Sequence, residues 1–112
     1  MSWYFLCHKH ELPVNSTKSF STNIKKEEIL ELLVLTQQDQ VYVYKNHCPH
    51  LGIPLNWQPD KFLSIDEAHI QCSTHGALFT FEEGVCIAGP CSGQSLISLP
   101  IEQRNDEIWL QY

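Results

Sequence analysis

Residues 48–52 read Cys-Pro-His-Leu-Gly, and residues 72–76 read Cys-Ser-Thr-His-Gly. Each stretch places one thiol and one imidazole close together and follows them with a glycine. Pro49 fixes its own backbone angle, while Gly52 and Gly76 permit the positive φ or close backbone approach that a tight loop around a bulky ligand needs. Thiolates and neutral imidazoles bind both zinc and iron. The two stretches therefore predict two loops that share one metal centre with four ligands, Cys48, His50, Cys72 and His75.

The four ligands by themselves leave the kind of metal centre open. Two thiolates and two imidazoles suit a structural zinc ion, and they equally suit a 2Fe-2S cluster. The chain has five cysteines and six histidines in 112 residues, so short pairs of these residues also arise by chance. The glycine that follows each pair strengthens the prediction of a metal site, because glycine-bearing turns aim backbone amides at a bound cluster.

The two stretches, read as C-P-H-L-G and C-S-T-H-G-A-L-F, resemble the ligand loops of the Rieske family. Gly89-Pro90 resembles the proline loop that covers the cluster in that family, and the likeness runs from about residue 30 to about residue 110. The interval of residues 51–71 is longer than is usual in the family. This indicates an insertion around residues 56–69, which a surface loop tolerates.

The resemblance implies one 2Fe-2S cluster, with Cys48 and Cys72 on one iron and His50 and His75 on the other. It also implies a soluble electron carrier rather than an enzyme. Such a carrier passes one electron from a reductase to an acceptor, such as an oxygenase or another oxidoreductase. Two alternatives stay open, a small electron-relay subunit of a larger oxidoreductase and a structural zinc-binding module.

Four further positions bear on the reduction potential that the resemblance implies. High-potential members of the family carry an additional cysteine in each ligand loop, where this chain has Ile53 and Thr74. They also carry hydroxyl donors where this chain has Ala77 and Phe79. Donors of this kind stabilise the more negative reduced cluster, so their loss lowers the potential. A potential at the low end of the Rieske range is therefore expected.

The length of the chain predicts a single domain over residues 1–112, with its cluster-binding part at about residues 46–92. A second catalytic domain does not fit into this length. No apolar run approaches the length of a membrane span, and the N-terminus lacks the features of a secretory signal, so a cytoplasmic protein without membrane contact is expected. The odd number of cysteines favours thiols and metal ligands over a disulfide framework.

The charge balance bears on the partners. Asp and Glu number 13 against 7 Lys and Arg, which gives a formal net charge of -6. A nucleic-acid partner is not expected, because phosphate binding needs an excess of basic residues. An acidic surface instead favours a protein partner that carries a basic docking patch.

Short strands separated by turn residues predict an all-β fold, a Rieske-like domain of small antiparallel sheets with a two-loop cluster-binding subdomain. Residues 30–36 fit either a helix or a strand. The strand is favoured because residues 37–40 form a short polar gap before Val41-Tyr42-Val43-Tyr44. Residues 13–23 are interpreted as a loop with a short strand around Phe20. Other strands are expected at residues 3–6, 62–65, 70–72, 78–81, 85–88, 96–103 and 107–111.

The remaining thiols and imidazoles are interpreted as ordinary residues. Cys7 ends an apolar strand and is expected in the core, whereas His8 and His10 are expected on the surface. His47 and His69 are expected on the surface as well, His47 because neighbouring side chains point apart and it precedes Cys48.

Two further pairs of residues, one of cysteines and one of glutamates, have more than one possible role. Cys86 and Cys91 flank Gly89-Pro90 and could form a disulfide or hold a metal, but buried or loop thiols are favoured. Glu82-Glu83 is expected to be a solvated turn, with a smaller chance of contributing to partner docking.

Overall fold

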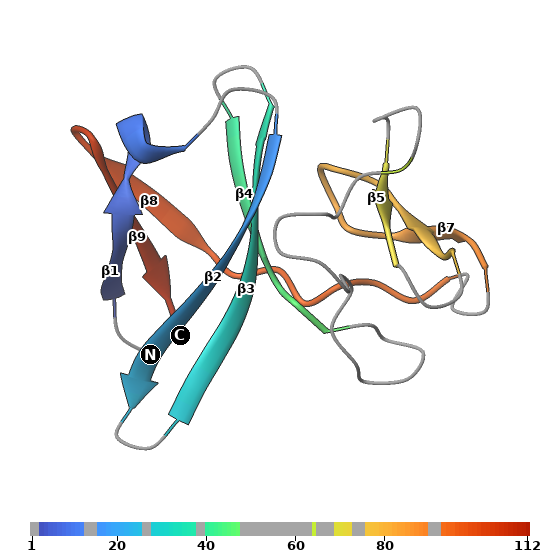
Figure 1. Ribbon diagram of the computed structural model, residues 1–112, viewed down its shortest axis with the longest axis horizontal. Helices are drawn as coiled ribbons and strands as arrows, with labels where there is room; N and C mark the ends of the chain where they lie inside the picture. The colour runs from blue at the N-terminus through green and yellow to red at the C-terminus, as the bar shows by residue number, and fades with distance from the viewer. Residues whose placement is uncertain are drawn as a thin grey trace.

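The structure is a computed structural model that describes residues 3–12, 16–25, 28–37, 40–47, 64, 69–72, 76–89 and 93–112 (Figure 1). In this part of the chain, nine strands form three antiparallel sheets, ordered β1-β9-β8, β2-β3-β4 and β5-β6-β7. The prediction of an all-β fold of small antiparallel sheets is confirmed. The elements are β1 (Trp3–His8), the 3-10 helix η1 (Lys9–Glu11), β2 (Ser16–Lys25), β3 (Glu28–Gln37), β4 (Gln40–Lys45), β5 (Ile70–Gln71), β6 (Leu78–Phe79), β7 (Cys86–Ala88), β8 (Ile101–Arg104) and β9 (Glu107–Gln111).

Two hydrophobic cores lie on opposite faces of the β2-β3-β4 sheet, which stands between the other two sheets in Figure 1. The base core joins this sheet to β1-β9-β8, and the cluster-side core joins it to β5-β6-β7. The base core consists of Cys7, Leu12, Leu30, Leu32, Val34, Val41, Val43, Leu99, Ile108 and Leu110. The cluster-side core consists of Leu33, Leu35, Tyr44, Ile70, Cys72, Ala77, Phe79, Cys86 and Leu96.

β3 contributes to both cores. Leu32 and Val34 belong to the base core, whereas Leu33 and Leu35 belong to the cluster-side core, as the alternation of side chains along a strand requires. A strand that is buried on both faces needs a continuous apolar run, which explains the sequence Leu-Leu-Val-Leu at residues 32–35. β3 pairs with β2 on one side and with β4 on the other. The strand interpretation of residues 30–36 is therefore confirmed over the helical one.

Residues 93–99 connect the cluster-side sheet to the central sheet without forming a long strand. On one side, Cys86 donates its backbone N–H to the Gln94 carbonyl and Leu96 donates to the Gly84 carbonyl, each over 2.8 Å. On the other side, Leu99 donates to the Val43 carbonyl over 2.9 Å, beside a single bridge between Tyr44 and Ser98. This segment therefore ties β7 to the edge of β4.

Tyr44 forms a second link between the two sheets. Its ring is 1% exposed in the cluster-side core, and its hydroxyl donates a 2.6 Å hydrogen bond to the carbonyl of Phe81 in the turn after β6. Burial raises the pKa of Tyr44 to about 12, helped by Tyr42 and by the carboxylates of Glu82 and Glu83. The neutral phenol is therefore the form that the fold accommodates.

Tyr44→Phe is expected to lower the free energy of unfolding by about 1 to 2 kcal/mol, because one net hydrogen bond to a backbone carbonyl is lost. The pH dependence should change too. A tyrosine whose folded pKa is raised from 10 to about 12 contributes stability that is present below pH 10 and is lost as the pH rises towards 12. Urea unfolding of both proteins between pH 8 and pH 11.5 checks this. A variant that loses as much stability on the alkaline side as the parent would contradict it.

Two expectations about the elements were wrong in detail, and one element was missed. The short strand expected around Phe20 is the ten-residue strand β2, paired with β3 along its length. The strand expected at residues 96–103 is confined to β8, because residues 93–99 form the connection between two sheets. The helix η1 was not expected. The strands expected at residues 3–6, 41–44 and 107–111 are confirmed. Those expected at residues 70–72, 78–81 and 85–88 are present as the shorter β5, β6 and β7, and the one expected at residues 62–65 lies almost wholly outside the described residues.

Candidate metal centre

The first predicted ligand stretch follows β4 directly. Asn46 is buried and donates its backbone N–H to the carbonyl of Glu31 over 3.0 Å, so the chain stays attached to β3 where β4 ends. His47 is exposed, as expected for a residue that is not a ligand, and its backbone N–H returns to the Lys45 carbonyl. The predicted ligands Cys48 and His50 lie outside the described residues.

The second predicted ligand stretch is the loop of the hairpin between β5 and β6. The hairpin pairs Ile70 with Phe79 and Gln71 with Leu78. Cys72 donates its backbone N–H to the Ala77 carbonyl, and Gly76 donates to the Cys72 carbonyl, both over 2.9 Å. Gly76 has φ +69, as the sequence predicted for this position. The backbone on both sides of the loop is therefore held in place, while the predicted ligand His75 lies outside the described residues.

Cys72 presents its thiol inside the protein. Its side chain is 0% exposed and belongs to the cluster-side core. A cysteine that ends a short strand, in a loop closed by backbone hydrogen bonds, is the kind of donor that holds the buried side of a metal centre. The thiol therefore fits the role of a ligand to a 2Fe-2S cluster.

The third predicted landmark lies against the second ligand loop. Gly89 has φ +102, and a Cβ built on it would lie 2.8 Å from Ala77 Cα. Only a glycine permits this approach of two backbones, because any side chain would collide with Ala77. The predicted proline loop thus begins in direct contact with the Cys72 loop, and Pro90 itself lies outside the described residues.

The side chains around Cys72 are apolar. Ala77 and Phe79 are 1% and 0% exposed and carry no hydroxyl. Cys86 is buried in the same core, and its thiol donates a hydrogen bond of 3.2 Å to the Ala88 carbonyl. Cys86 is thus a buried thiol, as the sequence favoured, while Cys91 lies outside the described residues.

The thiol and imidazoles near the N-terminus belong to the base of the protein rather than to this site. Cys7 is buried, and burial, with the nearby carboxylate of Glu11, raises its pKa to about 11, so it is inert as expected. His8 Nδ1 lies 3.0 Å from Glu11 Oε1, and His10 Nδ1 contacts Asp106 Oδ2. These hydrogen bonds hold the pKa of both carboxyl groups below the usual range. Both imidazoles are at the surface.

The four-ligand set stays a prediction, because three of its members lie outside the described residues. Nowhere in the described ranges do three or more His, Cys, Asp or Glu side chains gather around one possible metal position. In the same ranges, no helix is long and apolar enough to cross a membrane.

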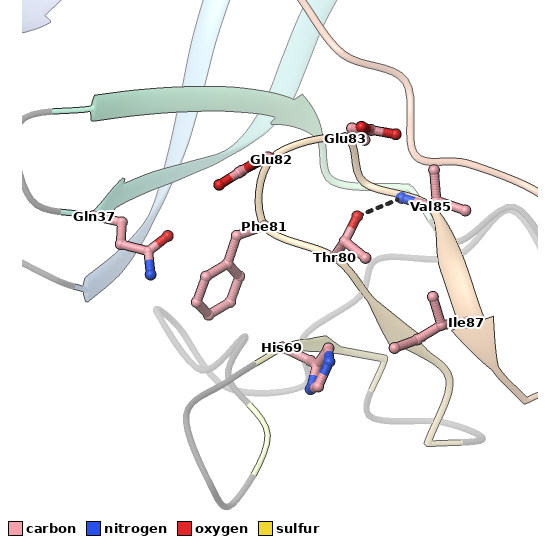
Figure 2. A pocket seen from close by; sticks show the side chains of 8 residues that line it. All are labelled: Gln37, His69, Thr80, Phe81, Glu82, Glu83, Val85 and Ile87. Atoms are coloured by element: carbon pink, nitrogen blue, oxygen red, sulfur yellow. Dashed lines mark hydrogen bonds between the residues drawn. The ribbon is translucent and has the colours of Figure 1, made fainter.

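A cavity of about 510 Å³ opens beside the cluster-side sheet, between the end of β3 and the β6–β7 turn (Figure 2). His69 was expected on the surface and Glu82-Glu83 in a solvated turn, but no sequence pattern placed them in one cavity or indicated the other lining residues. No sequence signal was available, since the lining comes from three separate segments of the chain. The described lining residues are Gln37, His69, Thr80, Phe81, Glu82, Glu83, Val85 and Ile87.

The fold and the placement of Cys72 define a class of protein, a small all-β domain in which a hairpin loop carries a buried thiol. Residues 2–103 match the Rieske [2Fe-2S] domain family. Since the match covers most of the sequence, the chain belongs to this family.

Similar proteins include enzymes and a carrier. The chain is 27% identical to a cholesterol 7-desaturase of Caenorhabditis elegans over an alignment of 124 positions. The alignment covers 98% of this chain and 26% of the desaturase. The terminal oxygenase of carbazole 1,9a-dioxygenase from a Novosphingobium species has a TM-score of 0.75 at 19% identity, covering 96% of this chain and 29% of the oxygenase. The ferredoxin of carbazole 1,9a-dioxygenase from Nocardioides aromaticivorans has a TM-score of 0.73 at 19% identity, covering 98% of this chain and 97% of the ferredoxin. The chain thus spans about a quarter of the desaturase and nearly all of the ferredoxin.

Proposed function

We propose that this protein is a single-domain electron carrier that passes one electron from a reductase to an oxygenase or another oxidoreductase acceptor. Membership of the Rieske family over residues 2–103 carries the proposal. A ferredoxin of a dioxygenase system shares the fold, which supports a role in electron transfer. Family membership also favours an iron-sulfur centre over the structural zinc module. The cytoplasmic location stays a prediction.

Cys48, His50, Cys72 and His75 would hold one 2Fe-2S cluster, with the thiolates on one iron and the imidazoles on the other. When bound, the cluster would supply a one-electron couple, and imidazole in place of thiolate on one iron would raise its potential above that of an all-cysteine cluster. Cys72 would anchor the cluster at the buried end, since its side chain is already inside the cluster-side core.

The surrounding side chains set the environment of that couple. Ala77 and Phe79 occupy the positions at which high-potential members of the family carry hydroxyl donors, and neither residue has a hydroxyl. Their apolar, buried side chains exclude water from the Cys72 side. The protein is therefore expected at the low end of the Rieske range of potentials, which suits an acceptor of the oxygenase kind.

A second candidate is an electron-relay part of a larger oxidoreductase. The lengths of the relatives favour this alternative, because the chain matches 26% of the desaturase and 29% of the oxygenase. The cluster and its ligands would be the same, and the electron would pass to a catalytic centre on another domain or subunit.

Purification without oxygen tests the proposal. About two irons and about two acid-labile sulfides per chain are expected, with visible absorption and a paramagnetic signal after reduction with dithionite. The midpoint potential, measured by redox titration of the absorption, should fall at the low end of the Rieske range. A single zinc ion without sulfide would refute both the carrier and the relay.

A further inference from the structure

The cavity beside the β6–β7 turn has an apolar floor. Phe81 and Val85 are half-buried there, and Ile87 keeps 51% of its surface exposed. Figure 2 shows the Phe81 ring between Gln37 and His69, with Ile87 on the far side of Thr80. The Thr80 hydroxyl accepts a hydrogen bond from the Val85 backbone, so it is used to shape the turn. An apolar surface of this kind can cover the carbon chain of an incoming side chain.

The rim of the cavity is acidic. Glu82 and Glu83 are both exposed in the turn, and neither forms an ion pair with any residue that the structure describes. Three described cations are placed elsewhere, since Lys18 lies over Phe20, Lys45 over Tyr112 and Arg104 over Trp109. Lys9 in η1 does not line the cavity either, and Lys25 in β2 pairs with the end of β3 opposite to Gln37. Apart from His69, no described lining residue is basic. Within the described residues, the carboxylates of Glu82 and Glu83 therefore have no lysine or arginine counter-charge.

The combination of an apolar floor and a carboxylate rim matches one kind of side chain. Lysine and arginine lay an apolar stem along an apolar surface and keep a charged head in a polar place. A cavity of about 510 Å³ has room for such a side chain with part of the surrounding surface. An acidic or neutral partner residue would leave the two carboxylates without a counter-charge.

The cavity lies beside the sheet that carries Cys72. His69 lines the cavity and precedes Cys72 by three residues, a separation of roughly 10 Å along an extended strand. A protein that docks here would therefore sit against the cluster-side half of the molecule. The opposite half, with β1, β8 and β9, lies on the far side of the central sheet in Figure 1.

We propose that this cavity is a docking site for a lysine or arginine side chain of a protein redox partner, held by Glu82 and Glu83 at the rim and by Phe81, Val85 and Ile87 below. That the partner is a redox protein rests on the proposed function. The site adds short-range recognition to the general attraction between a chain of net charge -6 and a basic protein.

Binding of cytochrome c, a lysine-rich one-electron protein, to the holoprotein tests this. Titration calorimetry at low ionic strength gives Kd for the parent and for Glu82→Gln/Glu83→Gln. The matched control is Glu102→Gln/Glu107→Gln on β8 and β9, which removes the same charge from the other half of the protein. We expect Kd to rise roughly three- to tenfold in the first variant and less than about twofold in the control.

A third variant separates the cavity from charge alone. Ile87→Ser leaves the net charge unchanged, and we expect it to raise Kd by at least about threefold, with thermal unfolding showing that it stays folded. Equal effects of the two double variants, or an unchanged Kd in Ile87→Ser, would overturn the docking site. Neither result would contradict the proposed function. That function is tested separately, by iron and sulfide content and by reduction of cytochrome c by the dithionite-reduced protein.

Discussion

Cys72→Ala is expected to lower the iron and sulfide content of protein purified without oxygen by at least about tenfold and to remove the visible absorption. The thiol is fully buried at the end of β5, in a loop closed by backbone hydrogen bonds to Ala77 and from Gly76. Of the other two described thiols, Cys7 lies in the base core and Cys86 donates a hydrogen bond to the Ala88 carbonyl. Iron and sulfide assays with a visible spectrum provide the measurement.

Two other buried cysteines serve as controls. Cys7→Ala removes a thiol from the base core, and Cys86→Ala removes one from the same core as Cys72. Both variants should keep the iron and sulfide of the parent, although each loses some stability because a small cavity is created. Equal loss of iron in Cys72→Ala and Cys86→Ala would show that packing of this core, rather than ligation, controls cluster retention.

The same assay examines the predicted ligands outside the described residues. Cys48→Ala, His50→Ala and His75→Ala should each lose the mixed-ligand spectrum. His47→Ala is the matched control, because His47 is exposed next to the first ligand stretch and is not expected to bind the metal. Damage from His47→Ala equal to that from His50→Ala would reject the assignment.

Gly89→Ala is expected to destabilise the holoprotein by about 2 to 4 kcal/mol and to weaken cluster retention. Two costs add up. An alanine at φ +102 is strained, and its Cβ would lie 2.8 Å from Ala77 Cα, so the backbone of the Cys72 loop must shift. Urea unfolding of the holoprotein measures the loss of stability. The rate of iron release to a chelator measures how firmly the Cys72 loop retains the cluster.

Gly93→Ala separates these two costs. Gly93 has φ +90, but a Cβ there would meet nothing within 4 Å. Its alanine variant should therefore show only the backbone strain, about 1 to 2 kcal/mol, with normal iron release. If the two variants lost equal stability and released iron at equal rates, contact between Gly89 and Ala77 would not matter to the site.

Local patterns predicted the parts of the fold that depend on local physics. The apolar run at residues 32–35 and the alternating β-branched and aromatic residues at 41–44 predicted β3 and β4, and both strands pair as expected. Gly76 predicted a tight loop, and it has positive φ. The position of Cys72 at the end of a strand followed from the same logic. These features are determined by neighbouring residues, so one sequence suffices to find them.

What escaped prediction depends on tertiary contacts. β2 contains serines, threonines and lysines, whose composition is typical of a loop, but it forms a strand because β3 offers it a full set of backbone partners. Residues 96–99 were expected to begin a strand, yet they belong to the segment that connects two sheets. The acidic cavity is assembled from β3, the residue before β5 and the β6–β7 turn. No sequence pattern predicts that these three segments come together.

The alternation of β3 between the two cores has a further consequence. Because neighbouring residues of one strand are buried in opposite cores, the described halves of the molecule cannot separate at β3 without exposing apolar side chains. Some redox proteins shorten the electron's path by swinging a tethered head between donor and acceptor. If the protein is the electron carrier proposed above, we expect it to reach its partners by rotation and diffusion of the described halves together, so that turnover depends on how quickly successive partners bind and dissociate.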